Sequence, residues 1–208
     1  MSINPYAPPA VIPEPTWPWR LRATAQELYR ILLLAPLVGA ALGGLFNIIN
    51  GYISPELFSR RMGWDDFIHL RSILQGMLEG SVYGLGNAIL FLIVGALFSR
   101  NPIPQSLVYQ LLVRIALLVT CCWAFVGIGY LAIVHWGSAL VVVPDAFWMP
   151  VSSVYGYAWV SGSIKGAVYG SPLCTLIGIA LLVRHQRRAS KLELTATAEY
   201  QYQPVAIP

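Results

Sequence analysis

The chain carries little charge. Asp, Glu, Lys and Arg together make up 11% of its 208 residues, 57% are hydrophobic, and the mean hydropathy is +0.63. An ordinary soluble domain carries about 25% charged residues, so this composition predicts an integral membrane protein. The net charge of +4 does not indicate nucleic-acid binding, because the thirteen Lys and Arg flank apolar runs instead of lining one face.

The chain also lacks the sequence motifs of common enzymes and metalloproteins. It contains no HExxH, nucleophile elbow, Walker loop, dinucleotide fingerprint or paired-carboxylate site. Its three histidines, His69, His135 and His185, are scattered over loops and span ends. We therefore predict no catalytic residue, no metal site and no cofactor, and expect a protein that is not an enzyme.

Cysteine is scarce as well. Cys121, Cys122 and Cys174 all lie in apolar segments, where we expect small packing residues and no disulfide framework. No cleavable signal peptide precedes the first apolar run, which begins near Ile31, so we expect this run to remain as a membrane span.

The apolar segments predict an all-α membrane protein with four transmembrane helices. A span of about 20 residues crosses a hydrocarbon core, and Thr24 and Glu27 have capping-box spacing before the first apolar run. We expect spans at about 31–52, 107–134 and 162–183. The second span is expected to begin near Gly76, within a longer helix over 65–99. The predicted domains are a proline-rich, disordered cytoplasmic tail (1–23), a first two-span repeat (24–106), a second two-span repeat (107–184) and a disordered cytoplasmic tail (185–208).

The stretch 137–163 is rich in aromatic residues and is interrupted by Pro144, Pro150 and glycines. These interruptions predict an aromatic loop that rests on the membrane interface. A re-entrant hairpin that lines a cavity is the alternative.

An internal repeat supports two units. Gly76-Met-Leu-Glu-Gly-Ser-Val-Tyr-Gly84 recurs as Gly162-Ser-Ile-Lys-Gly-Ala-Val-Tyr-Gly170, identical at five of nine positions. Arg30-Ile-Leu-Leu likewise resembles Arg114-Ile-Ala-Leu. Because each unit holds two spans, the two copies point the same way across the membrane, which predicts a parallel duplication.

Glycines at spacing four form a flat ridge on each glycine-rich span. Such ridges allow close helix–helix approach in lipid, so we predict that the second and fourth spans touch along them. The predicted helix-packing residues are Gly76, Gly80, Gly84, Gly162, Gly166 and Gly170.

Polar residues inside the spans define one candidate site. Glu79 and Lys165 occupy equivalent positions of the repeat, each followed one turn later by a tyrosine. A charge at this depth is costly, so the two side chains either pair or face a watery vestibule, and Lys165 can also reach the interface alone. The candidate polar site comprises Glu79, Lys165, Tyr83, Tyr169 and Asn87.

Two further amides, Asn47 and Asn50, lie near the end of the first span. We predict that they form hydrogen bonds between helices, and a role in binding a ligand is the alternative.

The distribution of basic residues predicts the orientation. With the N-terminus inside, nine Lys and Arg lie on the cytoplasmic side and four on the other, so both termini are expected in the cytoplasm.

The stretch from Asn47 to Phe58 resembles the Ser-Pro-Glu-Tyr-Phe element that follows the first span in a group of uncharacterised bacterial membrane proteins. Leu57 stands where that group has Tyr. The resemblance covers about a dozen residues, implies a bacterial inner membrane and carries over no activity.

These features predict a structural or interaction component of the membrane. Its expected partners are the lipid bilayer and, through the glycine ridges, another protein or a second copy of the chain. The alternative is a small transporter or channel with a vestibule at Glu79 and Lys165.

Overall fold

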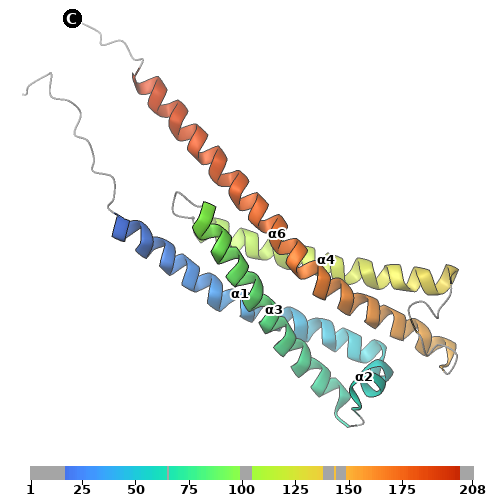
Figure 1. The fold of residues 1–208 in the computed structure, drawn as a ribbon. Helices are drawn as coiled ribbons and strands as arrows, with labels where there is room; N and C mark the ends of the chain where they lie inside the picture. Colours follow the sequence, from blue (N-terminus) through green and yellow to red (C-terminus); the bar gives the residue numbers. More distant parts are fainter. Residues whose placement is uncertain (1–16, 65, 99–104, 138–142, 144–148, 202–208) are drawn as a thin grey trace, which may run out of the picture.

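The fold is entirely helical in the part of the chain that the structure describes. This structure is a computed structural model, and it describes residues 17–64, 66–98, 105–137, 143 and 149–201. The helices are α1 (Trp17–Ile53), α2 (Pro55–Met62), α3 (Ile68–Phe98), α4 (Gln105–Trp136) and α6 (Val151–Gln201), as Figure 1 shows. The predicted all-α class is confirmed.

Four of these helices are long and apolar enough to cross a membrane. The candidate spans are Tyr29–Ile53, Ile68–Val94, Ser106–Trp136 and Ser153–Arg188. Large apolar side chains remain exposed on their outer faces, among them Leu37, Leu117 and Phe125. An outward apolar surface suits lipid contact, so the prediction of a multi-pass membrane protein is confirmed at this level.

The helix ends differ from the predicted ones. Helix α1 begins at Trp17 and not at Thr24, with Pro18 in its first turn, where a missing N–H costs no intrahelical bond. Residues 1–16 of the predicted tail lie outside the described residues.

Helix α6 is longer than expected at both ends. It begins at Val151, so the second part of the predicted aromatic loop is helical, and it continues past Arg188 to Gln201 in place of the predicted disordered tail. Pro144 and Pro150 both precede Val151 in the sequence. Residues 138–142 and 144–148 of the predicted loop and residues 202–208 of the predicted tail lie outside the described residues.

Helix α2 is a short helix between the first two spans. Pro55 occupies its first turn, Glu56 follows it, and Arg60 and Arg61 lie in the last turn, which complements the helix dipole at both ends. Gly63, with φ of 66°, caps the C-terminus in the left-handed conformation.

The four spans form two hairpins. Helix α1 crosses α3 in the first, and α4 crosses α6 in the second (Figure 1). The start of α1 and the end of α6 lie on the same side of the bundle, and α2 lies at the opposite end (Figure 1).

The glycine ridges lie within the hairpins, which corrects the predicted contact between the second and fourth spans. On α3, Cβ atoms built on Gly76 and Gly80 would lie 2.2 and 2.0 Å from the carbonyl oxygens of Gly43 and Gly39 on α1. Gly84 meets the backbone of Ala35 in the same way. The ridge of α3 therefore packs on α1. The contacts that helix α3 makes with α6 lie outside this ridge.

The second ridge has an equivalent place. A Cβ atom on Gly166 would lie 2.3 Å from the carbonyl oxygen of Cys122, and Gly162 and Gly170 face Tyr130 and Cys122 of α4. Both ridges are thus covered by the partner helix of their own hairpin, and a protein partner or second copy would have to use another face.

Clusters of buried apolar side chains join the two hairpins. One cluster draws on all four spans, another centres on Phe46 and Trp123, and a third packs α2 on α6. The buried members of the first cluster are Ile31, Ala35, Ala88, Phe91, Val108, Leu111, Ile179 and Leu182.

Candidate functional site

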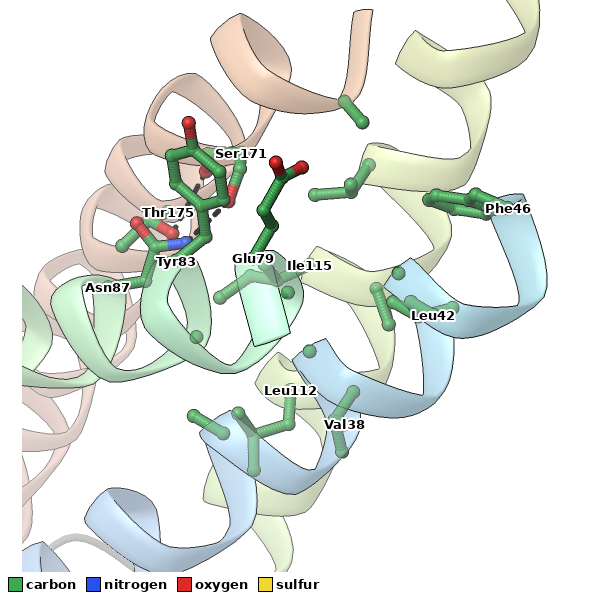
Figure 2. A pocket seen from close by; sticks show the side chains of 18 of the residues that line it. Val38, Leu42, Phe46, Glu79, Tyr83, Asn87, Leu112, Ile115, Ser171 and Thr175 are labelled. Carbon is green, nitrogen blue, oxygen red and sulfur yellow. Dashed lines mark hydrogen bonds between the residues drawn. The ribbon is translucent and has the colours of Figure 1, made fainter. Parts of the chain in front are cut away.

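A cleft of about 140 Å³ lies between the two hairpins. Side chains of α1, α3, α4 and α6 line it, and Figure 2 shows Val38 and Leu42 of α1 facing Leu112 and Ile115 of α4 across it. An apolar cavity of about 150 Å³ is large enough to hold a benzene-sized ring. The cleft therefore has room for a small apolar group or a segment of lipid chain.

Three predicted site residues meet at this cleft. Glu79, Tyr83 and Asn87 lie one turn apart along one face of α3 and all line it (Figure 2). The Glu79 carboxylate is exposed and accepts a hydrogen bond of 2.7 Å from the Gln75 amide one turn earlier. Successive polar groups at spacing four therefore form a polar stripe on an otherwise apolar span.

The other two predicted site residues lie elsewhere. The Lys165 ammonium donates a hydrogen bond of 2.9 Å to the Tyr130 hydroxyl of α4 and lies 5.0 Å from the centre of that ring. Tyr169 is 73% exposed, and neither Lys165 nor Tyr169 lines the cleft. Within the described residues no ion pair joins Glu79 to Lys165, because each side chain has its partner on its own hairpin.

Helix α6 contributes two polar residues that the sequence analysis missed. Asn87 donates a hydrogen bond of 2.5 Å to the Ser171 hydroxyl, the contact marked by a dashed line in Figure 2. Thr175, one turn further, donates to the Ser171 carbonyl at 3.0 Å. Ser171 and Thr175 share one helix face directly after Gly170, and this polar spacing of four in an apolar helix was the signal that could have identified them.

Asn47 and Asn50 form hydrogen bonds between helices, as predicted. The Asn47 amide donates to the Ser72 carbonyl of α3 at 2.9 Å, and the Ser163 hydroxyl of α6 lies 3.1 Å from Asn50 Oδ1. Both asparagines are buried and line the cleft. Asn50 consequently ties the first hairpin to the second.

Aromatic rings line the cleft beside Asn50. Phe46 stacks on Trp123 with 4.8 Å between ring centres, and both side chains line the cleft. Trp159 of α6 meets Trp123 edge to face at 5.4 Å but does not line the cleft. Phe46 and Trp123 come from α1 and α4, so this end of the cleft is built by both hairpins.

The cysteines pack as small side chains. Cys122 and Cys174 lie with their sulfur atoms 3.8 Å apart at the α4–α6 crossing, Cys174 is buried, and all three cysteines are free thiols. In the part of the chain that the structure describes, no three His, Cys, Asp or Glu side chains are grouped as metal ligands would be.

Comparison of the chain with protein-family models, with curated proteins and with solved structures found no match. Function has to be inferred from the cleft itself.

Proposed function

We propose that this protein is a binding component of the membrane, in which the cleft between the two hairpins holds a small hydrophobic molecule. The observation that carries the proposal is the cleft lined by all four spans. Its walls are mostly aliphatic and aromatic, with a few polar groups such as Asn50 and Asn87, a combination typical of small-molecule sites. Ligands of such a site can enter from the bilayer.

The packing of the spans supports ligand binding over helix-mediated assembly. The glycine ridges are covered inside the hairpins, so they are not free to bind another helix. The two hairpins are instead held together by separated contacts, including the Asn87–Ser171 and Ser163–Asn50 hydrogen bonds. A bundle of two tight halves with a cleft between them can admit a ligand without disrupting either half.

A duplication and a bacterial inner-membrane location belong to the same proposal. The equivalent crossings at Gly80 and Gly166 support descent of both hairpins from one ancestral unit. The basic cluster Arg184, Arg187 and Arg188 near the end of the fourth span favours cytoplasmic termini.

Filling the cleft tests the proposal. Val168 lines the cleft, whereas Leu173 on the same helix is 56% exposed and does not. We expect the wild-type protein, extracted in a mild detergent, to retain a small molecule in native mass spectrometry. Val168→Trp should lose it, and the matched control Leu173→Trp should retain it.

The proposal fails if the wild-type protein carries no bound molecule even after hydrophobic compounds are added. It also fails if Val168→Trp, shown to be folded by its circular dichroism, binds as well as Leu173→Trp. Both variants add the same indole to α6, so a difference between them reports on the cleft and not on bulk.

A small transporter is the second candidate function. The exposed Glu79 carboxylate at the cleft favours it, because an ionisable group within a span often marks a transport pathway. If the bound molecule enters proteoliposomes with the wild-type protein but not with Glu79→Gln, and Glu79→Gln still binds it, the protein is a transporter. If the molecule binds but does not enter, the protein is a binding component.

A further inference from the structure

Two buried polar side chains that line the aromatic end of the cleft each have a nitrogen atom without a hydrogen-bond partner. They are Asn50 Nδ2 on α1 and Trp123 Nε1 on α4. Asn50 is fully buried and Trp123 is 8% exposed. Leaving a buried donor unsatisfied costs about 1–3 kcal/mol, so two together call for an explanation.

The two groups lie at the same end of the cleft. Asn50 and Trp123 both line the cleft, and Phe46, one turn before Asn50 on α1, stacks on Trp123. Trp159 contacts Trp123 edge to face but does not line the cleft, so its nitrogen is not part of this group. One helix of each hairpin thus places an unpartnered donor at one end of the same cleft.

The chemistry of these groups indicates what they bind. An indole nitrogen donates a hydrogen bond and cannot accept one, so Trp123 requires an acceptor. The cleft walls around it are apolar and aromatic, which suits a ring or a hydrocarbon chain. The matching ligand is a hydrophobic molecule with an exposed oxygen acceptor.

Charge at the cleft separates neutral from anionic ligands. Glu79 is the one Asp, Glu, Lys, Arg or His among the described residues that line it, and Lys165 is engaged with Tyr130 outside it. A phosphate or carboxylate would enter a cleft that offers a negative charge and no cation, at a high desolvation cost.

We propose that the Asn50–Trp123 end of the cleft binds the carbonyl oxygen of an uncharged, lipid-soluble molecule. This inference rests on the proposed binding function and specifies its ligand class. Two sources offer this chemistry, namely the ring carbonyl of a quinone with an isoprenoid tail and the ester carbonyl of a neutral acyl lipid.

The experiment measures binding of four probes to the full-length protein in detergent. These are a benzoquinone with a short isoprenoid tail, a diacylglycerol, an isoprenoid hydrocarbon without oxygen and an ionised fatty acid. We expect at least one carbonyl probe to bind at least fivefold more tightly than the hydrocarbon, and the fatty acid to bind more weakly than that probe. The tighter of the two carbonyl probes identifies the source.

Replacing the indole of Trp123 tests its hydrogen bond. Trp123→Phe removes the N–H but keeps an aromatic ring, and it should weaken binding of the carbonyl probe about fivefold to tenfold while leaving binding of the hydrocarbon unchanged. Trp136→Phe is the control, because Trp136 is 82% exposed at the end of α4 and does not line the cleft.

The outcomes separate this inference from the proposed function. If the carbonyl probes and the hydrocarbon bind equally, or if Trp123→Phe binds the carbonyl probe as tightly as Trp136→Phe does, the donors are satisfied by water and the inference is wrong while the binding function stands. If the fatty acid binds best, the ligand is not neutral and the inference is also wrong. If no probe binds, the proposed function fails as well.

Discussion

The crossing of α1 and α3 predicts a large difference between two glycine-to-alanine changes on the same helix. At Gly80 an added Cβ atom would lie 2.0 Å from the Gly39 carbonyl oxygen and 2.7 Å from its carbon, both backbone atoms that cannot rotate away. At Gly86, about one and a half turns later, nothing lies within 4 Å of an added Cβ atom. Gly80→Ala should therefore destabilise the protein, and Gly86→Ala should not.

The geometry sets the size of the effect. Ordinary contact begins near 3.4 Å, so α1 and α3 must separate by about 1.4 Å at Gly80. A gap of about 0.5–1 Å already forfeits a quarter to a half of the dispersion energy of the contacts along the crossing, and overpacking costs about 1–3 kcal/mol. We expect Gly80→Ala to lose about 2–3 kcal/mol, and Gly86→Ala to gain up to about 1 kcal/mol from helix propensity.

Reversible unfolding in mixed micelles, followed by circular dichroism, measures both free energies of unfolding. The expected difference between the two variants is about 2–4 kcal/mol. Equal stability of Gly80→Ala and Gly86→Ala would refute the close α1–α3 crossing. A loss at Gly80 that is fully restored by shortening side chains on α6 would instead place the ridge against the second hairpin.

Two more predictions concern contacts within the second hairpin and between the two. Because Lys165 bonds to Tyr130 and not to Glu79, the changes Glu79→Lys and Lys165→Glu should be additive, with a coupling energy below about 0.5 kcal/mol in a double-mutant cycle of unfolding free energies. A coupling energy above about 1 kcal/mol would instead indicate that Glu79 and Lys165 form an ion pair. Mild oxidation should join Cys122 to Cys174, whose sulfur atoms are 3.8 Å apart, within one chain, as detected by mass spectrometry of peptides, and a failure to cross-link would place the α4–α6 crossing elsewhere.

The sequence predicted the spans well because their signal is local. A run of about 20 apolar residues has few alternatives in a helical membrane protein, and Asn47 and Asn50 inside such a run had to find partners on neighbouring helices. The same reasoning placed Glu79, Tyr83 and Asn87 on one face, because spacing of four is a property of a single helix.

Local sequence signals could not predict which helices pack against each other. A glycine ridge shows which face of a helix can approach a neighbour closely, but it does not show which neighbour. The ridge containing Gly80 meets the complementary small residues Gly39 and Gly43 on α1. Lys165 was misassigned for the same reason, because its partner Tyr130 lies on the adjacent helix and carries no charge to reveal it.

Helix ends were the remaining difference. The prolines before Val151 led to the prediction of a loop, and the segment after the fourth span was predicted to be a disordered tail. In the structure, Val151 and Gln201 lie in one continuous helix. Proline disrupts a helix only where its missing N–H is needed, and charged residues are compatible with a helix that leaves the bilayer.

The placement of each glycine ridge inside its own hairpin has a consequence for how the protein is made. Translation delivers α1 and α3 before α4 and α6, so the first pair can cover its ridge while the second pair is still on the ribosome. The first hairpin then enters the bilayer with its glycine ridge already covered, so that ridge is not exposed to helices of other proteins. In this order of events the last step of assembly is the docking of the two hairpins, and the cleft is the space that remains between them.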